Sequence, residues 1–357
     1  MENLNYLKPI ELDKLIENPL TSVLMVNYNY ARFIEEAIES VIDQSYKNWE
    51  LIICDDGSTD ESVEIVESIC KTEERIKLIK KENGGVASAL NMGYSKCKGE
   101  IICLLDSDDV FHKDKIEEVI QILHTNMSSG FCIHKVLPIN WLGKPINKPI
   151  PINITEGWVA KKALLTGGRT PMPPASGLAF RRKVLESIFP LSLEFNIYAD
   201  GIIAELSQYI TIISSIKKPL SGFRLHSSNT TSVFLDYPNK ASILKGQTKH
   251  ALFIQTHKTF IKKNLGPEFV TFFDFTKREN FWDEKLALFI LDSKPKNGIE
   301  GHSGKEMCLL ISNKYRGAIW RLLIILPGRI AKKILKLWWS PSAVKKYLTF
   351  ISRYTNY

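Results

Sequence analysis

Apolar residues in the first 124 positions form two alternating kinds of pattern. Short, nearly continuous apolar runs are typical of strands buried on both faces, and longer runs with apolar residues three or four positions apart are typical of helices. The first kind occupies residues 21–26, 49–54, 76–79 and 100–105, and the second occupies residues 31–44, 58–70, 84–97 and 113–124. This alternation predicts an α/β fold with right-handed crossovers, in which helices flank a mostly parallel sheet on both faces.

The pattern changes after residue 124. Residues 130–175 are rich in Pro and Gly and give no clear assignment, whereas residues 176–188 predict a strand or loop that enters a helix. Apolar periodicity returns around Asp200, and beyond about residue 238 the sequence is helical, aromatic and basic in character. These shifts predict three parts: an N-terminal extension (1–20), an α/β domain (21–237) and a mainly helical, basic C-terminal region (238–357).

Polar segments follow four of the predicted strands. They read NYNY, DDGSTD, KENGG and DSDD, at residues 27–30, 55–60, 81–85 and 106–109. In doubly wound parallel sheets, ligands bind beyond the carboxyl ends of the strands, where such loops meet. We therefore expect the four loops to line one ligand crevice.

The last of these loops places three carboxylates at the end of an apolar strand. Asp106 and Asp108 fall on the same side of an extended segment, because side chains alternate along it. Hard oxygen ligands of this kind suit Mg²⁺ or Mn²⁺, and magnesium keeps open positions for substrate phosphates. The alternative is a solvated acidic loop, in which Asp109 caps the next helix.

Other loop features fit a nucleotide. The Asp56 carboxylate can accept a hydrogen bond from a base edge, and the Tyr28 ring can stack on a planar base. Gly84 and Gly85 precede a predicted helix, whose N-terminus can receive phosphate. Ordinary structural interpretations exist as well: a turn with a helix cap for residues 55–60 and a half-buried aromatic side chain for Tyr28.

Composition is typical of a globular protein and excludes several other classes. The 357 residues are 44% hydrophobic and 24% charged, which allows a substantial core and argues against disorder. None of the six cysteines forms a C-x-x-C pair, so we expect reduced thiols in a cytosolic protein, without a disulfide frame or a zinc site. The first twenty residues lack the apolar core of a secretory signal, and LLIILPG is far shorter than the roughly 20 residues of a membrane span.

Positive charge gathers near the C-terminus. The formal net charge is +8, and ten basic residues but no acidic ones follow Glu306. Residues 328–339 read GRIAKKILKLWW, a basic amphipathic pattern with tryptophans that fits an anionic membrane surface. Residues 314–357 would then hold the protein at the cytoplasmic face of a membrane. The alternative is an ordinary helix packed on the first domain; nucleic acid is a poor partner, because this apolar-rich segment lacks a reader motif.

Five ordered segments resemble the family 2 glycosyltransferases of GT-A fold. They are TSVLMVNYN, WELIICDDGSTD, NGGVASALNMGYSKCKGEIICLLDSDD, SGLAFRR and RLHSSNTTS, within residues 20–232. The resemblance implies a Rossmann-like GT-A domain, a nucleoside-diphosphate sugar donor such as a UDP-sugar, Mn²⁺ or Mg²⁺, and inversion at the anomeric carbon. The acceptor would be a saccharide or a lipid-linked hydroxyl, in the synthesis of cell-surface polysaccharide or glycolipid.

By the same resemblance, the motifs assign roles to particular residues. Tyr28 would lie against the base and Asp56 would bind its edge, in a donor-binding set that includes Gly84 and Gly85. Asp106 would contact ribose and metal, and Asp108 would ligate the metal directly.

The family's catalytic carboxylate falls in YADGIIAEL, which makes Asp200 the candidate base. This segment departs from the usual pattern: Ala199 precedes the aspartate and Gly201 follows it, where family members often have Glu and Trp, and a later Arg is absent. His226 in RLHSSN matches a family histidine that can approach the diphosphate or the metal. The alternative for His226 is a surface or structural histidine.

Two other functions use similar features. A sugar nucleotidyltransferase would need a Gly-rich basic loop of the G-x-G-x-R kind near its start, and VNYNYARF lacks it. A non-catalytic protein on the same scaffold would bind a nucleotide-sugar or a partner without turnover, and the unusual neighbourhood of Asp200 is compatible with this. Glycoside hydrolases also use two carboxylates, but they do not need base-binding and metal loops.

Overall fold

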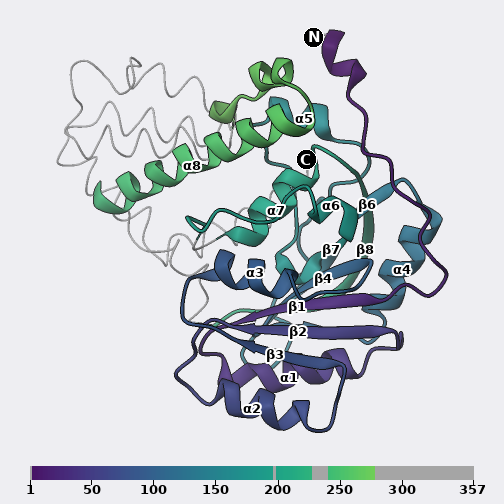
Figure 1. Cartoon of the computed structure of the whole chain (residues 1–357), viewed down its shortest axis with the longest axis vertical. Coiled ribbons are helices and arrows are strands. Elements are labelled where there is room, and N and C mark those ends of the chain that lie inside the picture. Colours follow the sequence, from purple (N-terminus) through teal and green to yellow (C-terminus); the bar gives the residue numbers. More distant parts are fainter. Residues whose placement is uncertain (1, 196–197, 227–239, 278–357) are drawn as a thin grey trace. The chain divides into compact units, whose positions relative to one another are not determined.

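The structure, a computed structural model, describes residues 2–195, 198–226 and 240–277 (Figure 1). The chain divides into two compact units: one holds Met1–His226 and His257–Phe273, and the other holds Ser227–Thr256 and Asp274–Tyr357. Of the second unit, the described part is the start of a long helix and a short 3-10 turn. The expected domain boundary at 237/238 and the basic tail (314–357) lie outside the described residues.

The first unit is built on one eight-stranded sheet, in the order β3-β2-β1-β4-β7-β6-β8-β5. The strands are β1 (Thr21–Asn27), β2 (Trp49–Asp55), β3 (Ile76–Lys80), β4 (Ile101–Asp106), β5 (Val110–Phe111), β6 (Ser129–Ile139), β7 (Leu178–Arg181) and β8 (Ile212–Arg224). Strands β1 to β4 run parallel, and β7 is antiparallel to both of its neighbours. Strand β6 is parallel to β8, and β5 is antiparallel to β8. The predicted α/β class is confirmed, and the antiparallel strands make the sheet mixed.

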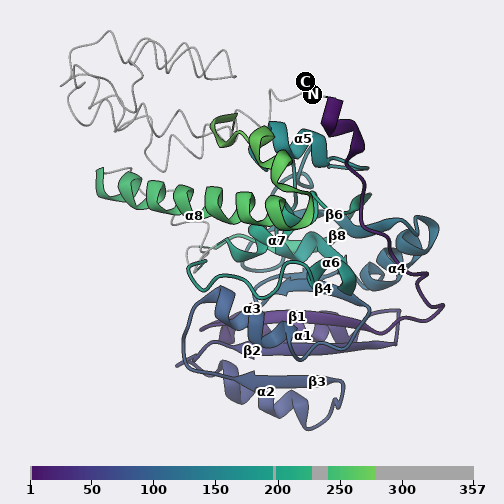
Figure 2. The same cartoon turned by 45° about the horizontal axis from the view of Figure 1, so that its top comes forward.

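Helices cover both faces of the parallel strands (Figure 1). Helices α1 (Ala31–Ile42), α2 (Ser62–Cys70) and α4 (Lys115–Thr125) share one apolar core with the strand residues Val23 and Leu51. Leu24 points to the opposite face, where it meets Gly93 of α3 (Val86–Tyr94). Figure 2 shows α3 beside the parallel strands. The other helices are α5 (Ala160–Leu165), α6 (Arg182–Leu185), α7 (Ala199–Ser207) and α8 (Lys240–Asn264). In the described part of the chain, no helix has the length and hydrophobicity needed to cross a bilayer.

Strands β6 and β8 were not evident in the hydrophobic pattern. Their sequences, SGFCIHKVLPI and IISSIKKPLSGFR, contain Pro, Lys and Ser at interior positions. Their pairing also shifts register around His134 and Lys135. Long-range pairing defines these strands, because neither shows a continuous apolar run or a strict alternation.

Two expected helix starts differ in the structure. Helix α2 begins at Ser62, four residues after the expected start at residue 58. Asp60 keeps the preceding residues in a loop, because its carboxylate accepts the N–H groups of Ser62 at 3.1 Å and Ala31 at 2.9 Å. Asp109 does not cap α4, whose N-cap residue is Asp114.

Candidate active site

Hydrogen bonds draw the loops after β1, β2 and β4 together at one edge of the sheet. Asn29 has a left-handed backbone (φ 60°), and its Oδ1 accepts the N–H of Thr59 at 2.7 Å. The N–H of Asn29 donates to Ser58 Oγ at 2.9 Å. Ser107 Oγ donates to the carbonyl oxygen of Val26 at 2.6 Å. The polar ends of these strands therefore meet in one place.

Asp56 and the glycine loop form one hydrogen-bonded unit. The buried Asp56 carboxylate accepts the N–H of Gly84 at 3.0 Å and that of Gly85 at 2.8 Å, and Lys81 Nζ lies 2.5 Å from it. Gly85 has a φ of 85°, a conformation that favours glycine at this start of α3. Asp56, which was predicted to meet a base edge, thus binds Gly84 and Gly85, which were predicted to meet a phosphate. Their donor-binding roles stay predictions, and the structure adds that Asp56 shapes the loop.

Tyr28 lies in the loop after β1, next to Asn29. Its side chain is 46% exposed, which is compatible with the half-buried aromatic of the alternative interpretation as well as with stacking on a base. An exposed ring at this edge suits stacking on a planar base, which stays the predicted role of Tyr28.

The structure separates the three carboxylates of the acidic loop. Asp109 is fully buried, and its two oxygens accept hydrogen bonds from Ser176 Oγ at 2.6 Å and from the N–H of Arg224 at 2.8 Å. Asp108 is also buried, and its Oδ2 lies 2.9 Å from His226 Nε2. Asp106 ends β4 and is exposed. Asp109 therefore anchors the loop to β8, and Asp106 and Asp108 are left as candidate ligands.

Burial and like charges raise the pKa values in this cluster. Asp106 as a whole residue is exposed, but protein surrounds its carboxyl group. Loss of hydration raises the pKa of this carboxyl group well above the ordinary value, and the negative charges of Asp109, Asp108 and Asp200 raise it further. Burial raises the pKa of Asp108, although the hydrogen bond and charge of His226 oppose this. A bound cation would lower both pKa values, because it favours the charged carboxylates.

The donor atoms of the cluster suit a hard divalent cation. Asp106 and Asp108 offer carboxylate oxygens, which Mn²⁺ and Mg²⁺ prefer, and His226 adds an imidazole nitrogen. Across the described residues, no three or more His, Cys, Asp or Glu side chains are grouped closely enough to hold a metal ion by themselves. A cation bound here would therefore need further ligands, and diphosphate oxygens have the right chemistry.

Aromatic packing orients His226. Its ring stacks on Phe33 with a centroid distance of 4.8 Å, and it meets the edge of Tyr30 at 5.9 Å. Both aromatic residues lie at the start of α1. The first helix and the segment after β8 thus jointly hold the imidazole against Asp108.

Arg224 ties the acidic loop to a more distant turn, and the sequence did not identify it. The guanidinium is fully buried: Nε donates to the carbonyl oxygen of Asp108 at 2.7 Å, and Nη1 to that of Trp141 at 3.1 Å. Nη2 lies 2.6 Å from Glu36 Oε2. The signal in the sequence was FRLH, in which the arginine lies between two apolar residues. An arginine that is buried in such a segment needs a charged or polar partner.

Arg224→Met should lower the free energy of unfolding by roughly 1–3 kcal/mol, the cost of a buried polar group left without its partner. Urea denaturation measures the change. Glu36→Gln is the matched control, because it removes only the half-exposed partner of the ion pair and should cost less than about 1 kcal/mol. Equal losses in the two variants would contradict the assigned role of Arg224.

Asp200, the candidate base, lies in the first turn of α7. Its negative charge contributes to the raised pKa of Asp106, so the two carboxyl groups share one electrostatic environment. Burial raises the pKa of Asp200 itself, although the N–H groups of Gly201 and Asp200 oppose this. A carboxylate with a raised pKa is a better proton acceptor once it is ionised.

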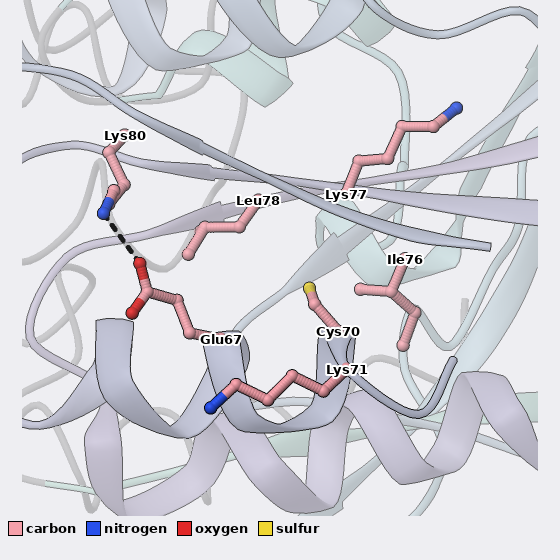
Figure 3. A pocket seen from close by; sticks show the side chains of 7 residues that line it. All are labelled: Glu67, Cys70, Lys71, Ile76, Lys77, Leu78 and Lys80. Carbon is pink, nitrogen blue, oxygen red and sulfur yellow. Dashed lines mark hydrogen bonds and ion pairs between the residues drawn. The ribbon is translucent and has the colours of Figure 1, made fainter. Parts of the chain in front are cut away.

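A separate hollow of about 480 Å³ lies between α2 and β3 (Figure 3). None of its lining residues belongs to the four polar loops; they are Glu67, Cys70, Lys71, Ile76, Lys77, Leu78 and Lys80. Its carboxylate, Glu67, is paired with Lys80 at 2.7 Å. The hollow therefore offers little catalytic chemistry, and the candidate site stays at the carboxyl edge of the sheet.

Sequence comparisons show that the chain is similar to glycosyltransferases. The sequence model described as Glycosyl transferase family 2 matches residues 22–189. An uncharacterized glycosyltransferase of Nostoc sp. (strain PCC 7120) is 34% identical over 212 residues, 58% of this chain and 65% of that protein. Another, from Rickettsia conorii, is 34% identical over 237 residues, 64% of this chain and 36% of that one. Chondroitin synthase of Pasteurella multocida is 38% identical over 111 residues, 31% of this chain and 12% of that one. The chain thus spans only part of the length of these relatives.

Solved structures share the fold at low sequence identity. Residues 1–349 of TarS from S. aureus align with a TM-score of 0.54 and 16% identity, covering 92% of this chain and 91% of that one. The same fragment in complex with UDP-GlcNAc aligns with a TM-score of 0.50. The mannosyltransferase PcManGT from Pyrobaculum calidifontis, in complex with GDP-Man and Mn²⁺, aligns with a TM-score of 0.52 and 16% identity, covering 96% and 92%. These likenesses confirm the predicted GT-A fold.

Proposed function

The chain belongs to glycosyl transferase family 2, and on that premise we propose that it transfers a sugar from a nucleoside-diphosphate sugar to an acceptor hydroxyl with inversion. One observation carries the proposal: Asp108 and His226 lie 2.9 Å apart at the carboxyl edge of the sheet, next to Asp106 at the end of β4. These groups suit charge stabilisation at the leaving group, and an inverting transfer also needs a base at the acceptor, for which Asp200 in α7 is the candidate.

Asp200 is the proposed base. Its carboxylate would take the proton of the acceptor hydroxyl as that oxygen forms a bond to the anomeric carbon. The bond from this carbon to the diphosphate oxygen breaks on the opposite face, and the nucleoside diphosphate leaves with the electron pair. Asp106, Asp108 and His226 would provide the protein's ligands for Mn²⁺ or Mg²⁺ and leave the remaining positions to diphosphate oxygens. When bound, the ion neutralises charge on the leaving diphosphate.

A UDP-sugar is the proposed donor. TarS has been solved with UDP-GlcNAc and PcManGT with GDP-Man, so GDP-mannose is the second donor to test. Tyr28 would stack on the base, and Asp56 with Lys81 would lie near its polar edge. Gly84 and Gly85 would help to form the donor pocket.

A saccharide or a lipid-linked hydroxyl is the proposed acceptor, in the synthesis of cell-surface polysaccharide or glycolipid. The relative named chondroitin synthase supports a saccharide acceptor. We place the protein in the cytoplasm, and the basic residues of 314–357 would bring it to an anionic membrane surface.

A UDP-sugar together with Mn²⁺ should raise the melting temperature, because a ligand that binds only the folded state adds to its stability. At 100 times its dissociation constant, such a ligand contributes about 2.7 kcal/mol. Differential scanning fluorimetry with UDP-GlcNAc and MnCl₂ measures the shift, with MnCl₂ alone as the control. No shift with any nucleoside diphosphate and metal would rule out the donor site.

A shift without turnover would instead support a non-catalytic binding protein on the same scaffold. Release of UDP or GDP from a panel of nucleotide sugars, measured on the same samples, separates the two functions. Water serves as the acceptor in this assay until a saccharide acceptor is found.

A further inference from the structure

A second buried polar cluster lies beside α7, the helix that carries the candidate base. Glu205 and His257 are 3% and 0% exposed, and Glu205 Oε2 lies 3.0 Å from His257 Nε2. The other ring nitrogen of His257 lies 2.9 Å from Tyr209 OH, and the Phe273 ring stacks on the imidazole at 5.0 Å. A buried carboxylate is costly unless it is paired, so His257 supplies a partner that Glu205 requires.

Glu205 also holds the turn that precedes Asp200. Tyr198 OH donates to Glu205 Oε1 at 3.0 Å. The Tyr198 backbone is left-handed (φ 64°, ψ 25°), which is uncommon for a residue with a bulky side chain. Its ring packs on the first turn of α7, because a Cβ on Gly201 would overlap it. The hydrogen bond and the glycine together keep this conformation immediately before the candidate base.

We propose that Tyr198, Glu205 and His257 are positioning residues that fix the direction of the Asp200 carboxyl group. The proposal rests on the glycosyl transfer proposed above, with Asp200 as the base. The interaction runs from the His257 imidazole through the Glu205 carboxylate to the Tyr198 hydroxyl, two residues before Asp200. These three residues act through the turn and need no contact with substrate. The same packing explains why glycine follows Asp200 in this chain.

The segment His257–Phe273 thereby becomes part of the support of the active site. It follows the expected boundary at 237/238 in the sequence, yet it belongs to the first compact unit. The second half of α8 and the residues after it contribute His257 and the Phe273 ring that covers the imidazole. Transfer activity should therefore depend on a segment that the sequence pattern assigned to the C-terminal region.

Tyr198→Phe tests the proposal by removing a single hydroxyl group. The turnover number for UDP release from a UDP-sugar should fall about 10- to 100-fold, because a misplaced base slows the chemical step. The KM for the donor and the melting shift with UDP and Mn²⁺ should stay within about twofold of wild type, because donor binding is unchanged.

His257→Gln, which keeps an N–H donor for Glu205, should lose less activity than His257→Leu. Combining Tyr198→Phe with His257→Leu should cost little more than the larger single loss, because both act through one turn.

Tyr209→Phe is the matched control. It removes a hydroxyl from the same cluster, at the other nitrogen of His257, and leaves the link from His257 to Tyr198 intact. Its turnover should equal that of wild type. Wild-type turnover in Tyr198→Phe, or equal losses in the two Tyr→Phe variants, would overturn the positioning role. A wild-type protein that releases no nucleotide from any donor would overturn the proposed function itself, a result seen before any variant is compared.

Discussion

Asp108→Asn is expected to remove most of the Mn²⁺-dependent stabilisation by a UDP-sugar and to slow transfer about 10³-fold. A bound cation stabilises a leaving oxygen by several kcal/mol, and each 1.36 kcal/mol corresponds to about a factor of ten in rate. Asparagine keeps the shape of the side chain beside His226 but offers a neutral oxygen in place of a charged one. Fluorimetry with UDP-sugar, with and without MnCl₂, and an assay of nucleotide release measure the two effects.

The same variant should be as stable as wild type, or more stable, without ligand at pH 7. Burial raises the pKa of Asp108 above its usual 3.8, so the folded protein binds this proton more tightly than the unfolded chain. Such a group lowers stability as pH rises from its pKa in the unfolded chain through its raised pKa in the folded protein. Asparagine carries no charge and removes that penalty. A purely structural Asp108 would instead show a lower ligand-free melting temperature.

Asp114→Asn is the control for these measurements. Asp114 lies at the N-cap of α4 and pairs with Lys218, outside the acidic cluster. Its replacement removes one carboxylate charge without touching the proposed cation ligands. Unchanged Mn²⁺ dependence in Asp108→Asn, or an equal loss in Asp114→Asn, would contradict the assignment.

The first half of the fold was predictable because its signals are local. Strands β1, β2 and β4 are buried on both faces, so each reads as an apolar run, and the helices between the strands carry apolar residues at helical spacing. Strands β6 and β8 carry Lys135 and Lys217 within the strand, and both contain proline. Their existence depends on pairing across the sheet, which a single sequence does not display.

The candidate site was predictable to the extent that it lies at strand ends. In parallel sheets the loops after the strands meet at one edge, so the loops of Tyr28, Asp56 and Asp106 could be placed together without knowing which residues they contact. Arg224 and His257 were not predictable in this way, because each acts on residues more than 50 positions earlier in the chain. The hydrogen bonds from Gly84 and Gly85 to Asp56 likewise depend on how two loops fold together.

Asp200→Asn is expected to leave donor binding intact and to lower transfer by about 10²- to 10⁴-fold, the contribution of a positioned base. Asparagine fills the same space at the start of α7 but cannot take a proton from the acceptor hydroxyl. The melting shift with a UDP-sugar and Mn²⁺ should therefore match wild type while nucleotide release falls. Asp43→Asn, at an exposed aspartate after α1, controls for the loss of one charge.

The pH dependence of transfer gives a second, independent check on Asp200. Burial raises the pKa of this carboxyl group, so wild-type turnover should decline as pH falls through a value above the usual 3.8, where the base becomes protonated. The residual turnover of Asp200→Asn should lack that decline, because asparagine does not titrate. Wild-type turnover in the variant, or an unchanged acidic limb in its pH profile, would assign the base to another residue. Loss of the donor-induced melting shift would instead assign Asp200 to donor binding, since a base that contacts only the acceptor leaves the donor complex unaltered.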